Sequence, residues 1–431
     1  MKRFSCVLLA AAFGTAMIFT SCTKKNAAGS DVAEGTLRWA FWGSENRIKA
    51  SQAAIDAFQA ENPGIVINLE VSGGTGDHFN KVDTQLAGGS APDIIQMGGN
   101  FTDYIAKGVT LNLDEYIGTL LDTSSIDEGA LEAGSVDGHL YAVSTGATIP
   151  VLVYNKTKLE SYGAPLPKVT MTWSEFRDYL VAVKAKLPAG VYPLQDFGST
   201  PSSSTGFGYF TRDAGTPIYD LASNSTKVTE QSAKAFLDLF ADYRAAGLIP
   251  PADITAGYSE ANVDSSSLIA GKAMISFMVS NQFSAYQGAT TDDLGLIEAP
   301  NAAVNNALWP QLSQVYTVNA NSNNKEAAVK FVNFLANSPA AGAIIGNDRG
   351  ISSSTTFRDG AANVASDADK KVFAYHDVAG AHTSPETPHL PNDTELNSTL
   401  NLIYQNVAFG KLSTEQGAKD IVALLNRLIN K

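Results

Sequence analysis

The sequence predicts an α/β protein built from two domains, on three observations. The chain has 431 residues, and one domain usually holds about 100 to 200. Its composition, 44% hydrophobic and 17% charged, is that of a globular protein rather than a disordered one. From residue 37 onward, short strand patterns alternate with helical patterns. That alternation is typical of a parallel sheet covered by helices.

The first predicted unit is a strand, a helix and a second strand. The strand covers 37–41, and Ser44 follows as a candidate helix N-cap. The next apolar residues recur at helical spacing, at Ile48, Ile55 and Phe58. Asn62-Pro63-Gly64 ends this helix. Alternating, branched residues at 65–71 then predict the second strand.

The same unit repeats further along the chain. A helix is predicted from the apolar side formed by Phe79, Val82 and Leu86, and Gly88-Gly89 ends it. A short buried strand is predicted at 93–97, with another helix starting near Asn100. Repeated units of this kind predict parallel pairing of the strands.

The remaining chain continues the α/β pattern. Strands are predicted at 151–154 and 272–279. A helix is predicted over 173–185, with Thr172 as its cap and Glu175 as the capping-box partner. Further helices are predicted at 232–246, at 325–337, and around Ile421, Leu425 and Leu428.

The N-terminus predicts a secretory leader. Lys2 and Arg3 precede an apolar or small-residue stretch at 7–19, which is too short to span a bilayer comfortably. A cysteine, Cys22, directly follows small residues, and this resembles a bacterial lipobox, although Phe19 stands where that pattern prefers leucine.

We therefore expect a signal peptide at 1–21, lipidation of Cys22, and a flexible tether over 22–35. Ordinary cleavage nearby is the alternative. The other cysteine, Cys6, lies within the leader, so no disulfide is expected in the body of the protein. Removing the two leader cations would change the net charge from −13 to −15. Such an acidic chain is not expected to bind nucleic acid, whose phosphates require a basic face.

Ordered segments along the chain resemble one known family. They are FQAENPGIVINLEV, LAGGSAPDIIQM, LNLDEYI, VDGHLYAVSTGATIPVLVYNKTKLESYGAPLPKVTMTWSEF, SLIAGKAMISFM, NKEAAVKFVNFLANSP and FGKLSTEQGAKDIVALLNRL. In this order they are similar to the family 1 extracellular solute-binding lipoproteins of carbohydrate ABC importers, the class that includes maltose-binding protein. The similarity covers nearly all of the chain beyond the leader.

The resemblance implies the two-lobed periplasmic-binding-protein fold, with a ligand cleft between the lobes and hinge closure around the ligand. It places three hinge crossings near 144–149, 299–301 and 350–353. The implied lobes are 36–145 plus 300–350 for lobe one, and 148–298 plus 353–431 for lobe two.

The same resemblance implies a monomeric, membrane-anchored protein outside the cytoplasm. It would capture a saccharide and deliver it to ABC permease subunits, with no cofactor and no enzymatic activity. Two alternatives stay open: the same fold with a non-sugar cargo, such as a phosphate ester or a polyamine, and a lipoprotein enzyme acting on polysaccharide.

Candidate ligand contacts in lobe one follow the predicted strands, because ligands of open parallel sheets lie beyond the carboxyl ends of strands. After the first strand these are Trp42 as an aromatic platform, with Glu45 and Arg47 as hydrogen-bonding groups. The alternative is that Trp42 packs beside Trp39 while the two charged side chains are solvated.

Candidates after the next two strands are polar. Asp77 and His78 follow a glycine-rich turn that matches neither the dinucleotide fingerprint nor the P-loop. Helix capping is the alternative role for Asp77. Gln96 and Asn100 flank paired glycines, and Asn100 is a ligand contact or the cap of the next helix.

Candidates in lobe two and at the crossings complete the set. Asp196 lies near an aromatic loop that holds Phe207, Tyr209 and Phe210, and Asn281 and Gln282 follow a buried strand. Trp309 is the second predicted aromatic platform. Arg349, at the third crossing, would meet an acidic or hydroxyl-rich sugar, with a surface salt bridge as the alternative.

The sequence shows little sign of a metal-binding or catalytic motif. The five histidines fit no helical or finger spacing for a metal. The sequence has no GxSxG and no HExxH motif. We therefore expect no metal site, no cofactor and no catalytic residue.

The segments FWGSENR and GGTGDHF look most like those of family members that take plant-wall oligosaccharides, including pectic ones. Thr75 and Asp77 stand where those members tend to carry an aromatic residue. An oligosaccharide is expected in preference to a monosaccharide. A uronic acid would need arginines in the cleft, for which Arg47 and Arg349 are the first candidates.

Overall fold

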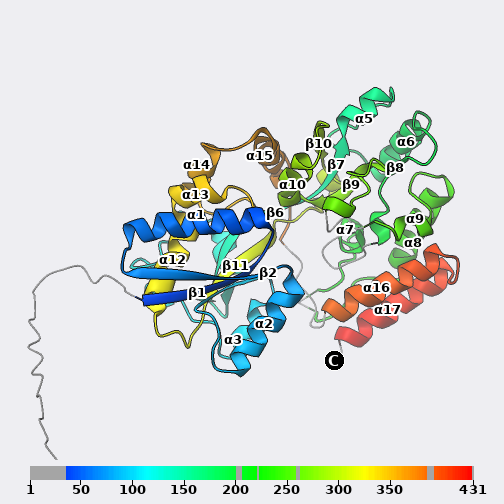
Figure 1. The fold of residues 1–431 in the computed structure, drawn as a ribbon. Coiled ribbons are helices and arrows are strands. Elements are labelled where there is room, and N and C mark those ends of the chain that lie inside the picture. The colour runs from blue at the N-terminus through cyan, green and yellow to red at the C-terminus, as the bar shows by residue number, and fades with distance from the viewer. Residues whose placement is uncertain (1–34, 200–205, 221–222, 259–262, 386–392, 430–431) are drawn as a thin grey trace, which may run out of the picture. The chain divides into compact units, whose positions relative to one another are not determined.

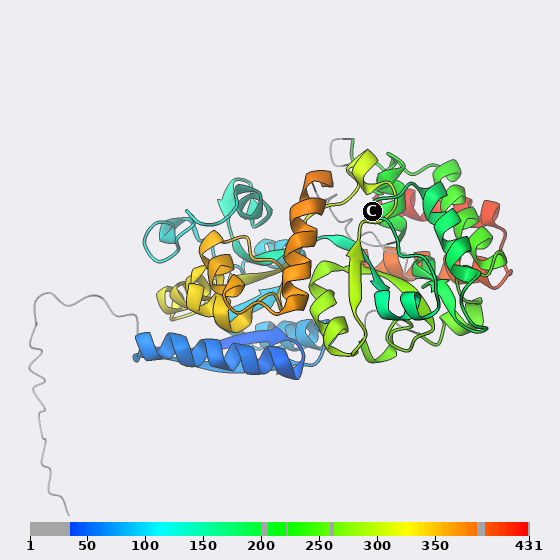
Figure 2. The same ribbon diagram turned by 90° about the horizontal axis from the view of Figure 1, so that it is seen from above.

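The computed structural model describes residues 35–199, 206–220, 223–258, 263–385 and 393–429. Their elements form two sheets with covering helices (Figures 1 and 2), which confirms the α/β, two-lobed prediction. A two-stranded ribbon, β4 (Ser135–Val136) and β5 (His139–Leu140), is the third sheet of this part of the chain. The predicted signal peptide, Cys22 and nearly all of the tether lie outside the described residues.

The sheet of lobe one has five strands in the order β2-β1-β3-β11-β6. The first three are parallel and β11 is antiparallel to both of its neighbours. Its strands are β1 (Gly35–Trp42), β2 (Ile65–Ser72), β3 (Ile94–Met97), β6 (Ala142–Thr148) and β11 (Gln311–Val318). The strands predicted at 37–41, 65–71 and 93–97 are therefore confirmed. The first extends to Trp42, because Trp42 still pairs with Ser72.

The side chains of β1 alternate between two cores, as predicted. Trp39 and Phe41 pack with α1 (Glu45–Glu61) and α12 (Lys325–Asn337). Ala40 packs with α2 (Thr75–Ala87) and α3 (Phe101–Ala106) on the other face. Figure 1 shows α1 and α2 on opposite sides of β1 and β2. Because successive side chains of a strand point to opposite faces of the sheet, this alternation decides which residues of β1 are buried under each layer of helices.

Local capping signals behave as predicted in most places. The Ser44 side chain accepts a hydrogen bond from the Arg47 amide and caps α1. Thr172 and Glu175 form the predicted capping box of α6 (Trp173–Lys184). At α2 the N-cap is Gly74, so Asp77 lies in the first turn and does not cap the helix. The predicted capping role of Asp77 is therefore wrong, because the helix starts one turn earlier within the glycine-rich segment.

The sheet of lobe two has four strands in the order β10-β7-β9-β8. They are β7 (Pro150–Asn155), β8 (Tyr192–Leu194), β9 (Ala273–Val279) and β10 (Leu294–Ile297). Only β8 and β9 pair in parallel, whereas β7 pairs antiparallel with both β9 and β10. Within lobe two, the parallel pairing expected from the sequence thus holds for β8 and β9, whereas β7 runs antiparallel to both of its neighbours.

Further helices cover the two sheets and carry the connections. They are α4 (Glu128–Ala133), α5 (Lys156–Ser161), α7 (Gly206–Asp213), α8 (Glu230–Ala245), α9 (Ala252–Thr255), α10 (Phe283–Gly288), α11 (Ala302–Asn305), α13 (Pro339–Ile345), α14 (Thr355–Ala362), α15 (Asp367–Ala379), α16 (Asp393–Ala408) and α17 (Thr414–Ile429). Within the described ranges, no single helix has the length and apolarity to cross a membrane. The bent pair α12 and α13, at 67°, reaches those thresholds together.

The chain passes between the lobes three times, and two passages differ from the predicted positions. The first joins β6 to β7 at 148–150. Residues 302–309 pack in the core of lobe two, so the second passage lies at Pro310 rather than at 299–301. The third passage follows α14, whose Phe357 and Ala361 pack in lobe one. Ile351, within the predicted third crossing, bridges Ala147 before the chain continues into α14.

By the packing of most of their buried residues, lobe one comprises 35–148 and 311–362, and lobe two comprises 149–309 and 367–429; Ile351 packs against the core of lobe two. The sequence could not place these boundaries, because short apolar segments such as 302–309 complete whichever core lies nearest in space. Residues 363–366 connect the two lobes at the third passage.

A glycine contact between α13 and α14 in lobe one yields a first prediction. A Cβ added at Gly360 would lie 2.0 Å from the Pro339 carbonyl oxygen, so the two backbones are in contact there. Gly360→Ala is expected to lower the free energy of unfolding by about 1–3 kcal/mol, the usual cost of overpacking. Urea denaturation measures the change.

The matched control is Gly129→Ala in α4, where an added Cβ meets nothing within 4 Å. That substitution should leave the stability unchanged or slightly raised, because alanine is the better helix former. Equal effects at the two positions would show that the α13–α14 contact is not tight.

Candidate functional site

The carboxyl ends of β1, β2 and β3 bring several of the predicted residues to one edge of the lobe-one sheet. Trp42 ends β1 and is half-buried. Its ring lies 5.1 Å from the ring of His78 and 5.8 Å from that of Phe79, both on α2. Trp42 therefore does not pack beside Trp39, the alternative considered from the sequence, since the two side chains lie on opposite faces of the strand.

His78, on α2, contacts both Trp42 and the end of β3. It is buried, and its Nε2 lies 2.9 Å from the carbonyl oxygen of Gln96 at the end of β3. Burial lowers the pKa of the imidazole, with the positive charge of Lys81 as a smaller contribution. The neutral ring thus holds α2 against β3 and positions Trp42.

Arg47 is engaged within the protein. Its Nε lies 2.5 Å from Asp348 Oδ2, and its Nη2 donates to the Asp348 carbonyl oxygen at 2.8 Å. Its Nη1 donates to the carbonyl oxygen of Trp42 at 3.1 Å. The side chain lies tight against Gly43, where a Cβ would be 2.3 Å from Arg47 Cδ. Arg47 therefore ties the end of β1 to the segment after α13, and a ligand would have to compete for the same donors.

Three other predicted residues line the same edge with less constraint. Glu45 is exposed and pairs with Lys49, one turn along α1, at 2.8 Å. Asp77 is exposed in the first turn of α2. Asn100 stands at the N-cap position of α3, but its Oδ1 accepts from the Gly98 amide at 3.3 Å instead of capping the helix. Glu45 and Asp77 are thus exposed, whereas the Asn100 side chain is partly buried.

Arg349 is buried in the core of lobe one, with 2% of its surface exposed. Its Nε donates to Gln96 Oε1 at 3.0 Å and its Nη2 to Ser51 Oγ at 2.8 Å. The guanidinium lies 5.5 Å from the ring centroids of both Trp39 and Phe41. Burial lowers the pKa of this guanidinium.

Both roles suggested for Arg349 by the sequence, a ligand contact and a surface salt bridge, are therefore wrong. Its one ion-pair partner among the described residues is the neighbouring Asp348, at 3.5 Å. The cause is that the segment after α13 packs against α1. Residue 349 therefore lies inside the lobe, where it bonds Ser51 of α1, rather than at the rim of the lobe.

Asp196 is also buried, at 1% exposure, in lobe two. Its carboxylate accepts from Arg244 Nη2 and from the Tyr404 hydroxyl, each at 2.5 Å. Burial raises the pKa of Asp196, against the opposing attraction of Arg244. The predicted ligand contact from Asp196 is thus replaced by a buried link between α8 and α16.

Trp309 is 3% exposed and packs in the core of lobe two. Its ring stacks on Tyr209 with centroids 6.4 Å apart, and the Arg212 guanidinium lies 5.3 Å from the Trp309 ring. Phe207 and Tyr209 are buried as well. The predicted platform role of Trp309 is therefore wrong, because residues 302–309 fill the interior of lobe two.

Asn281 of lobe two contacts lobe one directly. It lies in the short 3-10 helix Ser280–Gln282 that follows β9, and its Nδ2 donates to Ser313 Oγ of β11 at 3.4 Å. Its Oδ1 is buried without a hydrogen-bond partner, as is Oε1 of Gln314 on β11. Gln314 was not among the residues predicted from the sequence. The available signal was a polar residue within the alternating segment QLSQVYTV.

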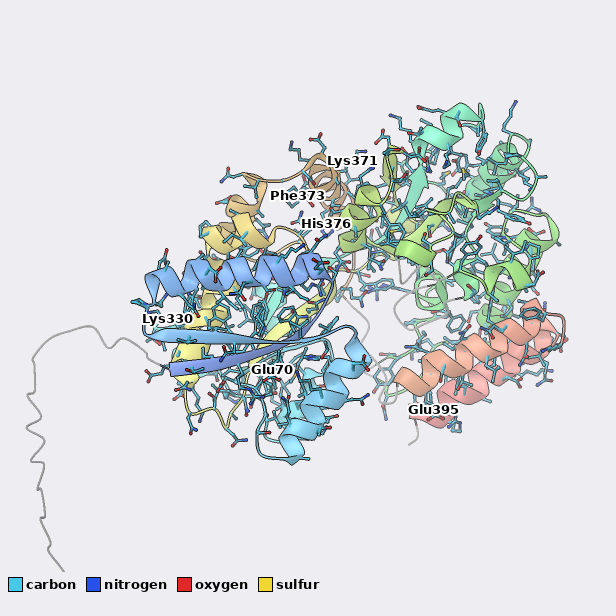
Figure 3. All side chains as sticks on the ribbon, viewed as in Figure 1. Glu70, Lys330, Lys371, Phe373, His376 and Glu395 are labelled. Atoms are coloured by element: carbon cyan, nitrogen blue, oxygen red, sulfur yellow. The ribbon has the colours of Figure 1, made fainter. Side chains whose placement is uncertain are left out.

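A histidine–serine pair lies at the first passage. His376, on α15 and labelled in Figure 3, places Nε2 2.7 Å from Ser280 Oγ, which also accepts from the Ile149 amide at 3.1 Å. Burial lowers the pKa of His376 to about 4. The neutral imidazole therefore connects α15 to the start of β7. Among the residues that the structure describes, no group of three or more His, Cys, Asp or Glu side chains could hold a metal ion.

Two α/β lobes joined by three passages, with an aromatic and polar edge beyond parallel strands, define a solute-binding protein. The chain belongs to the bacterial extracellular solute-binding protein family, whose pattern matches residues 42–342, more than half of its length.

Curated relatives match over part of their length. A binding protein of Brucella abortus is 29% identical over 130 residues, which are 30% of this chain and 31% of that protein. The multiple sugar-binding protein of Streptococcus mutans is 24% identical over 178 residues, which are 40% of this chain and 39% of that protein. The chain thus spans about a third of the length of the curated relatives it matches.

Solved structures match over nearly the whole chain. A family 1 extracellular solute-binding protein from Alicyclobacillus acidocaldarius is 27% identical with a TM-score of 0.72, covering 92% of this chain and 99% of that one. An oligogalacturonide-binding protein from Yersinia enterocolitica is 21% identical with a TM-score of 0.78, covering 92% and 98%. At that identity the second similarity concerns the fold alone.

Proposed function

We propose that this protein captures a saccharide, an oligosaccharide in preference to a monosaccharide, outside the cytoplasmic membrane and delivers it to the permease of an ABC importer. The observation that carries the proposal is the half-buried ring of Trp42 at the carboxyl end of β1, on the sheet edge where α1 begins with Glu45 and where Asp77 and Asn100 follow β2 and β3. Sugars present flat apolar faces and rings of hydroxyls, so their sites combine aromatic and planar polar side chains.

The two lobes would have different roles in binding. Trp42 would stack on a sugar ring, while Asp77 and Asn100 would exchange hydrogen bonds with its hydroxyls. Asn281 would reach the same ligand from lobe two, and closure of the lobes would give the importer a shape to recognise. The sugar-binding relative from Streptococcus mutans and the oligogalacturonide-binding structure support this cargo class.

The proposed location rests on the N-terminal pattern of the sequence. We propose that the leader directs export, that Cys22 is lipidated and that the monomeric protein remains attached to the membrane through the tether. A non-enzymatic role fits the family, and the residues proposed to bind ligand require no cofactor.

A thermal-shift screen tests the cargo class. A ligand that binds only the folded state stabilises it by RT ln(1 + [L]/Kd), about 2.7 kcal/mol at a hundredfold excess over Kd. Mono-, di- and oligosaccharides should therefore include a compound that clearly raises Tm. A screen in which only peptides, polyamines or metal ions raise Tm would rule the saccharide proposal out.

Trp42 supplies the second prediction. Trp42→Ala is expected to weaken binding of the saccharide found in the screen by about tenfold or more, about 1.4 kcal/mol, since an aromatic platform is removed. Isothermal titration calorimetry measures Kd.

Trp42→Phe is the matched variant, because it keeps an aromatic face and should retain most of the affinity. The Tm of each variant without ligand shows whether the fold is intact. An unchanged Kd for Trp42→Ala would show that Trp42 is not a platform.

A further inference from the structure

We infer that lobe one binds a small monovalent anion, of which chloride is the commonest, in its interior between the sheet and α1. We call this place the anion site and define it by Trp39 on β1, Gln96 on β3 and Arg349 after α13. It lies on the face of the lobe-one sheet that α1 and α12 cover (Figure 1). Two observations carry the inference: three buried donors lack an acceptor, and the buried charges beside them do not balance.

The three donors are buried and have no hydrogen-bond acceptor among the residues that the structure describes. They are Nε1 of Trp39, Nε2 of Gln96 and Nη1 of Arg349. The first two residues are 0% exposed and the third is 2% exposed, so bulk water does not reach them. Buried polar groups in native proteins nearly always have a partner, and a group without one indicates a bound water or ion.

The donors lie close together around the guanidinium of Arg349. Trp39 pairs with Ile94, so Gln96, two residues further along β3, lies on the same face of the sheet as Trp39. The guanidinium lies 5.5 Å from the ring centroid of Trp39. Its Nε donates to Gln96 Oε1 at 3.0 Å, which leaves the amide nitrogen of Gln96 as a free donor. The opposite orientation of this amide would set two donors against each other.

The charges beside these donors do not balance. The charged groups that act on the Arg349 guanidinium are Asp348 and Arg47. Nη1 of Arg349 lies 3.5 Å from Asp348 Oδ2 without a hydrogen bond. Nε of Arg47 lies nearer to the same oxygen, at 2.5 Å. Two guanidinium groups thus share one carboxylate, which leaves one positive charge inside the lobe.

This surplus charge is unfavourable unless a negative group compensates it. A buried charge needs a partner, because the interior does not solvate it as water does. Burial is the main influence on Arg349 and lowers its pKa, which agrees with incomplete compensation by the side chains around it. A monovalent anion would balance the charge.

An anion satisfies these groups better than a water molecule does. A halide only accepts, whereas a water also brings two hydrogens that need acceptors of their own. The oxygens next to the guanidinium, Gln96 Oε1 and Ser51 Oγ, already accept from it. The edge of an aromatic ring is positive, so the N–H edge of Trp39 also favours a negative partner. The burial of all three side chains favours a small ion over one as large as phosphate.

The anion would hold together several segments behind the candidate binding edge. Trp39 and Gln96 belong to β1 and β3, and Arg349 donates to Ser51 of α1. The carbonyl oxygen of Gln96 is also 2.9 Å from Nε2 of His78. Because such an ion binds only the folded lobe, it should stabilise the protein in proportion to the logarithm of its concentration above Kd.

The dependence of stability on halide tests the inference. The protein without saccharide is melted in sodium chloride, bromide or methanesulfonate at one ionic strength, so that screening by salt is equal. Chloride and bromide are expected to raise Tm by about 2 °C or more relative to methanesulfonate, which is too large for the site. Equal Tm values in the three salts would overturn the inference and leave a bound water as the partner of the donors.

Substitutions assign the halide effect to the site. Trp39→Phe removes one donor and keeps an aromatic ring, and it should raise the halide concentration of half-maximal effect about tenfold, the equivalent of one lost hydrogen bond. Arg349→Met removes the charge and should abolish the effect. Gln96→Leu, which should weaken it as Trp39→Phe does, serves if Arg349→Met does not fold.

The matched control is Arg177→Met, which removes a guanidinium that pairs with Asp242 on the surface. It should keep the full halide effect. An effect that stays unchanged in both Trp39→Phe and Gln96→Leu would place the ion elsewhere and overturn the anion site.

A crystal grown in sodium bromide locates the ion directly. Anomalous scattering should show a bromide in contact with Nε1 of Trp39 and Nη1 of Arg349. Bromide peaks at the protein surface alone would mean an adventitious ion only and would overturn the inference.

Discussion

Replacing Asp196 by asparagine is expected to lower the free energy of unfolding by about 3–5 kcal/mol, because it breaks a buried ion pair and leaves the Arg244 charge without its partner. The carboxylate is 1% exposed and binds both Arg244 and the Tyr404 hydroxyl. Chemical denaturation in urea measures the loss. Ligand affinity should change little in the folded fraction, since Asp196 lies inside lobe two.

Two further variants show whether the loss of stability comes from the buried Asp196–Arg244 pair or from the loss of any paired aspartate. Asp242→Asn removes the carboxylate that binds Arg177 on the surface, and little change in stability is expected there. Replacing Asp196 by leucine and Arg244 by methionine together should cost much less than Asp196→Asn alone, since apolar replacements of buried pairs are often neutral. The raised pKa of Asp196 agrees with this, because burial disfavours its charge. Equal losses in Asp196→Asn and Asp242→Asn would contradict the buried-pair interpretation.

His376 is expected to make the protein less stable in acid by about 3 kcal/mol. Its pKa is lowered from 6.5 to about 4 by burial, and one unit of pKa corresponds to about 1.4 kcal/mol. Between these two values the unfolded chain binds a proton at this histidine and the folded protein does not. Stability therefore falls as the pH falls from 6.5 to 4, with no further loss from this group below 4.

The comparison of the protein with its His376→Gln variant isolates this contribution, since His78 and the carboxylates titrate in both. The stability advantage of histidine over glutamine should shrink by about 3 kcal/mol from pH 7 to pH 4 in urea denaturation. Ser280→Ala is the matched control, because it removes the hydrogen-bond partner of His376 without removing the titrating group. Parallel pH curves for the protein and His376→Gln would show that the imidazole is not buried as described.

The family and much of the local structure could be predicted because their signals are local. Strands 37–41 and 65–71 are marked by alternation and by branched residues, and these patterns survive in any tertiary arrangement. Ser44 and Thr172 cap helices through hydrogen bonds to backbone groups two or three residues away. The order of such segments along the chain carried the family resemblance.

The candidate site was predicted in part for the same reason. Trp42, Asp77 and Asn100 directly follow strands, so the sheet itself brings them to one edge. The segments that hold Asp196, Trp309 and Arg349 are irregular, and no periodicity tells which side of an irregular segment is buried. Each of these three residues turned out to lie in a core, with partners up to 298 residues away in the chain.

By itself, the sequence determined the α/β class, the family, several capped helices and the first three strands of lobe one, because these depend on interactions between residues close in the chain. Only the tertiary structure decided that Arg349 and Asp196 are internal, that residues 302–309 belong to lobe two, and that Asn281 of lobe two contacts Ser313 of lobe one. Those outcomes depend on which distant segments meet, since burial and the pairing of charges are settled by neighbours in space.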